Sequence, residues 1–200
     1  MSRLTIWGVE GIGEISANDQ LGEVIADICR QVPNGPLLDN DVLVVTQKIV
    51  SKAEGRLVPI DASDPLSHKH LVEQEAVRIV RRRGDLIITE TKHGFICANS
   101  GIDLSNIERG YAALLPIDSD KSARRIRDII RAKHGVNVGV IISDTFGRPW
   151  RKGLTDVAIG VAGVAGVLYA TVASRYCIAG GEIGKIAGAQ PFRTGPLLGA

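Results

Sequence analysis

Residues 143–151, with the sequence SDTFGRPWR, combine side chains that can hold a metal ion and phosphate. The carboxylate of Asp144 and the hydroxyl of Thr145 are hard oxygen donors, and the apolar residues 138–142 predict a buried strand that ends at them. The two arginines could hold phosphate oxygens through paired N–H donors, while Gly147 allows close backbone approach. The alternative is that Asp144 caps a turn and the arginines are solvated.

A second carboxylate lies in residues 99–106, NSGIDLSN, a polar loop after a predicted strand over residues 95–98. Asp103 in this loop could complete a metal site with Asp144. Two carboxylates and a hydroxyl leave coordination positions open, which suits magnesium or manganese carrying nucleotide phosphates better than zinc. Asp103 could instead be an ordinary turn residue.

A third segment, residues 46–56 with the sequence TQKIVSKAEGR, follows a predicted strand over residues 41–46. Lys48 and Lys52 are four residues apart, so they share a face if this stretch is helical. A lysine pair at the end of a strand could meet phosphates. The alternative is a solvated lysine face.

Several other polar residues are not expected to belong to a functional site. His68 and His70 lie in a polar stretch without a nearby thiol or third ligand, which predicts solvent exposure. Residues 81–83, three arginines, are expected at the end of a helix, where cations suit the negative end of the dipole. No serine, cysteine or threonine sits in a recognisable nucleophile elbow, so covalent catalysis by the protein is not indicated and no catalytic residue is assigned.

The composition is that of a soluble globular protein. The 200 residues are 44% hydrophobic and 23% charged, with a net charge of only +2, which gives no reason to expect nucleic-acid binding. The three cysteines are far apart and lack CxxC spacing, which argues against a disulfide framework and favours a reducing cytoplasm. The most apolar stretch, residues 157–172, is shorter than the roughly 20 residues that a membrane span requires.

Helix and strand patterns are intermixed along the chain, without a visible repeat or linker. The expected strands are residues 4–7, 41–46, 86–89, 95–98 and 138–142. Three helices are expected. The first begins at a cap formed by Asn18 or Asp19, the second lies between residues 71 and 83, and the third begins at a cap formed by Asp118 or Ser119. The closely spaced strands between residues 86 and 115 favour antiparallel pairing, so we expect an α+β fold with a mixed sheet.

Three of these segments, residues 46–56, 95–106 and 143–163, together resemble the F-420-0:gamma-glutamyl ligase family in order and spacing. The resemblance covers residues 7–164, and its most specific part is SDTFGRPWRKGLTDVAIGVAG. It implies an intertwined two-lobe ligase fold, with residues 1–167 as the ligase-like domain. Residues 168–200 form a Gly/Ala-rich tail that does not match, so the C-terminal part is expected to be incomplete relative to the family.

The resemblance implies an activity in coenzyme F-420 biosynthesis. The terminal carboxylate of F-420-0 would become an acyl phosphate at the expense of GTP, and the amine of L-glutamate would then displace phosphate. Magnesium or manganese would be required, and a monovalent cation is a further candidate. The resemblance also implies a homodimer. The cytoplasmic location and the absence of nucleic-acid and membrane partners are predicted from cysteine usage, net charge and the short apolar stretch.

The resemblance also assigns site residues, which we carry over motif by motif. The implied metal ligands are Asp103, Asp144 and Thr145. The implied nucleotide-binding residues are Ile12, Gly13, Glu14, Ile15, Gln47, Lys52 and Asn106. At Gly13 the chain departs from the family, which usually has proline there. Two other hypotheses remain: a truncated, inactive nucleotide- or metal-binding relative, and a metal-dependent phosphohydrolase.

Overall fold

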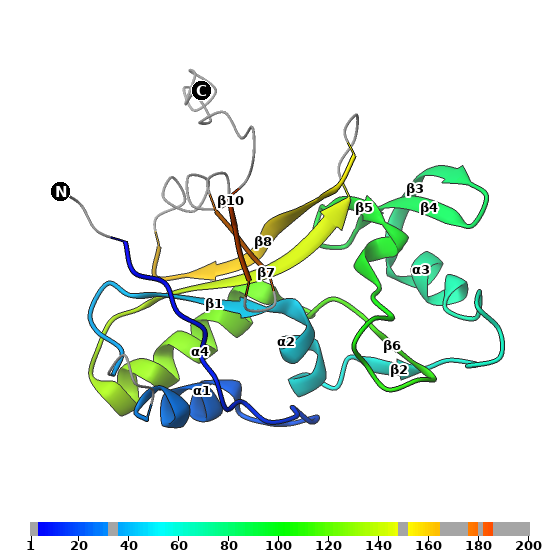
Figure 1. Ribbon diagram of the computed structural model, residues 1–200. Helices are drawn as coiled ribbons and strands as arrows, with labels where there is room; N and C mark the ends of the chain where they lie inside the picture. Colours follow the sequence, from blue (N-terminus) through cyan, green and yellow to red (C-terminus); the bar gives the residue numbers. More distant parts are fainter. Residues whose placement is uncertain (1–3, 32–35, 148–151, 165–175, 180–181, 186–200) are drawn as a thin grey trace, which may run out of the picture.

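The computed structural model describes residues 4–31, 36–147, 152–164, 176–179 and 182–185, which form an α+β fold with mixed sheets (Figure 1). The first sheet has the order β1-β7-β8, with β1 parallel to β7 and β7 antiparallel to β8. Two helices, α1 and α4, pack against each other, and α4 also contacts β7 and β8. The elements of this first lobe are α1 Leu21–Cys29, β1 Val42–Thr46, α4 Ser119–His134, β7 Gly139–Gly147 and β8 Leu154–Ala162.

The second lobe is built from the chain between β1 and α4, so the two lobes are intertwined (Figure 1). It contains an antiparallel sheet of order β3-β4-β5 and an antiparallel pair of β2 with β6. The pairing of β4 with β5 confirms the antiparallel arrangement predicted between residues 86 and 115. Its elements are α2 Gln47–Ala53, β2 Leu57–Pro59, α3 Lys69–Glu75, β3 Ala76–Arg83, β4 Leu86–Thr91, β5 Ile96–Ala98, η1 Asn99–Gly101 and β6 Tyr111–Ala113. Later in the chain, β9 Tyr176–Ala179 pairs with β10 Glu182–Lys185.

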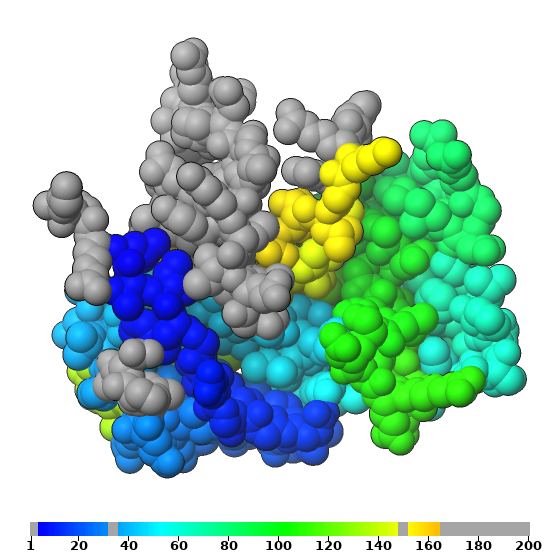
Figure 2. All heavy atoms as spheres, viewed as in Figure 1, coloured from blue at the N-terminus to red at the C-terminus, as the bar shows by residue number. Residues whose placement is uncertain are grey.

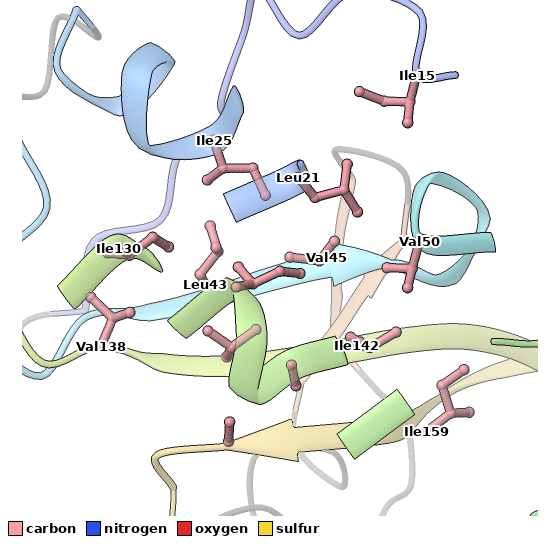
Figure 3. Packing of buried hydrophobic residues seen from close by; sticks show 14 of the residues in the cluster. Ile15, Leu21, Ile25, Leu43, Val45, Val50, Ile130, Val138, Ile142 and Ile159 are labelled. Atoms are coloured by element: carbon pink, nitrogen blue, oxygen red, sulfur yellow. The ribbon is translucent and has the colours of Figure 1, made fainter. Parts of the chain in front are cut away.

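The main hydrophobic core lies between the first sheet and its two helices (Figure 3). Ile25 of α1, Ile130 of α4, Val45 of β1 and Ile142 of β7 are all almost completely buried there. Burying one such side chain stabilises the fold by about 1.5–3 kcal/mol. This core holds β7 in place, and β7 carries the first candidate site motif. No helix in the described part of the chain is both long and apolar enough to cross a membrane.

The two helix caps predicted for the first lobe have different outcomes. At α4 the prediction is confirmed, because Asp118 Oδ1 accepts a hydrogen bond from the Lys121 backbone N–H at 2.8 Å. At α1 it is wrong, because the helix begins at Leu21 after Gln20 and has no side-chain cap. Asp19 Oδ2 instead accepts a hydrogen bond from the Ser16 backbone N–H at 2.8 Å, which closes a turn before the helix.

The helix predicted between residues 71 and 83 is wrong over most of its length. The helix α3 ends at Glu75, and residues 76–83 form strand β3, which pairs with β4. The β-branched residues of this segment favour a strand once β4 lies beside it. The three arginines at residues 81–83 are therefore strand residues, and the Arg82 guanidinium donates to Glu73 at 2.6 Å.

Two further expectations are corrected by the structure. Residues 4–7 have no regular secondary structure, so the strand predicted there is absent. The side chain of His68 is buried rather than exposed, with 7% of its surface accessible. This burial lowers the pKa of His68, with the nearby Lys69 charge acting in the same direction.

The contact between β8 and the start of α4 gives a first testable prediction. A Cβ at Gly160 would lie 2.4 Å from the Ser119 carbonyl carbon, so Gly160→Ala must push α4 away from the sheet. We expect this variant to lose about 1–3 kcal/mol of unfolding free energy, measured by urea denaturation. Gly8→Ala is the matched control, because a Cβ at Gly8 would have no atom within 4 Å. Equal stability of the two variants would contradict the packing.

Candidate active site

The Asp144-Thr145 motif lies within strand β7 and not at its end. We predicted that the strand would end at Ile142, but β7 continues to Gly147 because β8 pairs with it along this stretch. Strand β7 also contacts β5, which brings the motif to the loop that follows β5 (Figure 1). The two predicted metal-binding segments, far apart in the sequence, therefore meet.

The Asp103 carboxylate is held by an ion pair and by its own loop. Asp103 Oδ2 lies 2.8 Å from Lys48 Nζ, and Asp103 Oδ1 accepts hydrogen bonds from the backbone N–H and the hydroxyl of Ser105, both at 2.7 Å. Lys48 Nζ also donates to the Ser105 carbonyl at 2.6 Å. Burial raises the pKa of Asp103, but the hydrogen bonds from Lys48 and Ser105 outweigh it and leave the pKa below its usual value.

The Asp144 carboxylate has the opposite electrostatic balance. Burial raises the pKa of Asp144 to about 6, although the Thr145 backbone N–H donates to Asp144 Oδ1 at 2.8 Å and opposes this effect. The negative charges of Asp103 and Asp156 raise the pKa further, and the Lys48 charge only partly offsets them. At neutral pH Asp144 is therefore a partly buried carboxylate with incompletely compensated charge, which favours a bound cation.

Asp156 is a site residue that our sequence analysis did not single out. It lies on β8 directly opposite Thr145, and the Thr145 hydroxyl donates to Asp156 Oδ1 at 2.6 Å. The sequence did contain a weak signal, since Asp156 is the acidic residue within the otherwise apolar end of the SDTFGRPWRKGLTDVAIGVAG motif. Its relation to Thr145 follows only from the β7–β8 register.

The loop that presents Asp103 is held in an unusual backbone conformation. Asn99, Ser100 and Gly101 have φ angles of 50°, 55° and 70°, in the left-handed region that favours glycine. Buried hydrogen bonds hold this conformation: the Ser100 N–H donates to Thr89 Oγ1 at 3.0 Å, and the Ser100 hydroxyl donates to the Val72 carbonyl at 2.8 Å. The loop is thus fixed before any ligand binds.

The structure places the predicted nucleotide-binding residues in three different settings. Asn106 lies on the Asp103 loop, beside the residues that contact Lys48. Glu14 and Lys52 form an ion pair. Gln47, by contrast, is 2% exposed, and its amide N–H group donates to Ser51 Oγ at 2.6 Å and to the Leu114 carbonyl at 3.2 Å.

The remaining predicted residues belong to the N-terminal segment before α1, which has no regular secondary structure between residues 4 and 16. Ile15 is buried in the main core, and Ile12 packs against it. Gly13 has open space around it, because a Cβ there would meet no atom within 4 Å. In Figure 2 the green Asp103 loop lies beside the cyan segment that contains α2, with the yellow end of β8 nearby. Arg148, Trp150 and Arg151 lie outside the described residues.

The donor atoms at this site fit a divalent cation. Asp103, Asp144 and Thr145 supply only oxygen, and the incompletely compensated charge of Asp144 would be neutralised by Mg²⁺ or Mn²⁺. Across the described residues, no three His, Cys, Asp or Glu side chains could hold a metal by themselves. An ion at this site would therefore take further ligands from Thr145, water or a phosphate-bearing substrate.

Two partly buried carboxylates, Asp103 on a loop and Asp144 on strand β7, lie near a lysine and define a candidate site for metal-assisted phosphate chemistry. The chain belongs to the F420-0:gamma-glutamyl ligase family, whose sequence profile matches residues 11–185. This confirms the resemblance seen in the three motifs. The match continues beyond Val167, and the division of the chain at that residue stays a prediction.

Three curated relatives are each named coenzyme F420:L-glutamate ligase. The relative from Methanothermobacter thermautotrophicus is 39% identical over 176 residues, which cover 81% of this chain and 69% of the relative. The relative from Methanopyrus kandleri is 42% identical over 165 residues, covering 76% and 63%. The relative from Methanococcus maripaludis strain C7 is 46% identical over 146 residues, covering 66% and 58%. The chain thus spans between 58% and 69% of the length of these relatives.

Proposed function

We propose that this chain is a GTP-dependent ligase that adds L-glutamate to coenzyme F-420-0 through an acyl phosphate, with Mg²⁺ or Mn²⁺ as the required ion. A monovalent cation is a further candidate. The observation that carries the proposal is the meeting of Asp103 and Asp144 beside Lys48 in a member of the F420-0:gamma-glutamyl ligase family. Such a site favours reactions in which phosphate charge must be balanced.

The proposed reaction has two steps. In the first, a carboxylate oxygen of F-420-0 attacks the γ-phosphorus of GTP, the bond from that phosphorus to the β–γ bridging oxygen breaks, and GDP leaves with the electron pair. In the second, the neutral amine of glutamate attacks the acyl carbon. The bond from that carbon to the phosphate oxygen breaks, inorganic phosphate leaves, and the nitrogen loses a proton. The products are an amide, GDP and phosphate.

The protein contributes positioning and electrostatics to both steps. A divalent ion held by Asp103, Asp144 and Thr145 would neutralise charge on the transferring phosphoryl group. The buried hydrogen bonds of Gln47 fix the first turn of α2. This helix carries Lys48, which pairs with Asp103, and Lys52, which pairs with Glu14. Lys48 keeps Asp103 ionised, which preserves a negative ligand for the cation.

The direct experiment is incubation of the chain with F-420-0, GTP, L-glutamate and Mn²⁺ or Mg²⁺, followed by mass spectrometry of the coenzyme. We expect a product with at least one added glutamyl group, which disappears when GTP or the metal is left out. Binding of GTP or metal without a product would favour the non-catalytic relative. Phosphate release without a product would favour the phosphohydrolase.

We also propose that the chain forms a homodimer. Strand β3 exposes Val77 and Val80, with 66% and 45% of their surfaces accessible, and exposed apolar strands are often covered by association. Light scattering at micromolar concentration is expected to give twice the mass of the chain. A monomer under these conditions would contradict the proposal.

A further inference from the structure

Thr145 and Asp156 form a pair across the β7–β8 hairpin. They are directly opposite in the antiparallel register, and the hydroxyl-to-carboxylate distance of 2.6 Å is that of a charge-assisted hydrogen bond. The Thr145 backbone N–H donates to Asp144 Oδ1 at 2.8 Å. Thr145 is therefore connected to a carboxylate on its own strand and to a second one on the neighbouring strand.

The direction of the hydroxyl proton decides what Thr145 can do for a cation. A threonine hydroxyl has one proton and two lone pairs, and only a lone pair can bind a metal ion. The Thr145 hydroxyl donates its one hydrogen bond to Asp156, so its proton points at Asp156 and both lone pairs of Thr145 Oγ1 face elsewhere. Without such an acceptor, the hydroxyl could rotate and point its proton at the cation.

We propose that Asp156 is a positioning residue of this site: it accepts the hydrogen bond from the Thr145 hydroxyl and thereby presents a lone pair of Thr145 Oγ1 to a divalent cation. The inference rests on the proposed function, because the cation is part of it. Groups that orient metal ligands in this way typically change metal affinity by about 10–100-fold when they are removed. The same carboxylate could instead act only through its charge, and the two roles give different results in a double-mutant cycle.

The test measures Mn²⁺ affinity of the full chain by electron paramagnetic resonance of free Mn²⁺, without nucleotide or F-420-0. Asp156→Ala is expected to weaken binding at least tenfold in the unmodified background. In the Thr145→Val background, Asp156→Ala should cause little further loss of Mn²⁺ affinity, because the hydroxyl that Asp156 orients is gone. In the Thr145→Ser background, which keeps a hydroxyl, the loss should return. Asp156→Asn removes the same charge but keeps an acceptor oxygen, so it should weaken binding less than Asp156→Ala.

Asp128→Ala is the matched control, because Asp128 is an exposed carboxylate on α4. Its Mn²⁺ affinity should equal that of the unmodified chain. The inference is overturned if Asp156→Ala lowers the Mn²⁺ affinity by the same factor in the Thr145→Val background as in the unmodified chain. It is also overturned if the Asp156→Ala and Asp156→Asn variants bind Mn²⁺ equally weakly. If the chain still glutamylates F-420-0, either of these results contradicts only the role of Asp156 and leaves the proposed function standing. If the unmodified chain binds no Mn²⁺, the metal site and the inference fall together.

Discussion

Asp144→Asn is expected to raise the melting temperature of the protein at pH 7 and to abolish the metal-dependent nucleotide turnover that we propose for it. Both effects come from the partly buried charge of Asp144. Because the pKa of Asp144 rises from 3.8 to about 6 on folding, the folded state binds more protons than the unfolded state between these pH values. The free energy of unfolding therefore falls as the pH rises from about 4 to about 6, by on the order of 3 kcal/mol, and the lower stability persists at pH 7.

Asparagine has almost the same size as aspartate but carries no charge. The variant therefore lacks the pH-dependent loss of unfolding free energy, and it also lacks the proposed metal ligand. The measurement is the melting temperature of both proteins at pH 4 and pH 7 in a metal chelator. We expect the two proteins to be similar at pH 4 and the variant to melt several degrees higher at pH 7. An Asp144→Asn protein that is less stable at pH 7, or that keeps full turnover, contradicts this account of the site.

Lys48→Met is expected to have the second largest effect, because it removes the cation that faces Asp103. The Lys48–Asp103 pair is mostly buried, with side-chain exposures of 17% and 32%, so its loss leaves an unpaired carboxylate next to Asp144. We expect the metal-free variant to lose about 2 kcal/mol of unfolding free energy at pH 7, between the values of exposed and fully buried pairs.

Added Mn²⁺ should stabilise the Lys48→Met variant more than it stabilises the unmodified chain. The ion then restores positive charge between carboxylates that no lysine neutralises, and a ligand that binds the folded state stabilises it by mass action. The measurement is the shift in melting temperature over a range of Mn²⁺ concentrations. Lys121→Met serves as the control, because Lys121 is exposed at the start of α4. Identical shifts for all three proteins would show that Lys48 and the cation do not share a site.

The sequence predicted the elements whose local signals agree with their surroundings. In α4, the Asp118 cap and the helical spacing of Ala123, Ile126 and Ile130 point to the same face, and all three residues are buried. Segment 71–83 failed because its apolar residues fit a helical period over a few turns, while pairing with β4 decided the outcome. That pairing is a tertiary contact, which local spacing does not contain.

The candidate site shows the same division. Asp103 and Asp144 were predicted from loop and strand chemistry and from the family motifs, and the structure brings their segments together. Asp156 was missed because its importance depends on which residue of β7 it opposes. A register shift between Ile142 and Ser143 sets that pairing, and no spacing in the sequence reveals it. The burial of His68 likewise depends on packing across the second lobe.

In the proposed reaction, GTP activates the terminal carboxylate of F-420-0, and the amine of glutamate then takes the acyl group and releases phosphate. The most direct measurement uses F-420-0 whose terminal carboxylate carries ¹⁸O in both positions, with unlabelled GTP, L-glutamate and Mn²⁺, and analyses both products by mass spectrometry. The expected result is one ¹⁸O in the inorganic phosphate and one in the new amide, because the carboxylate oxygen that attacks phosphorus leaves with the phosphate. Unlabelled phosphate, with no glutamyl product, would contradict the proposed reaction.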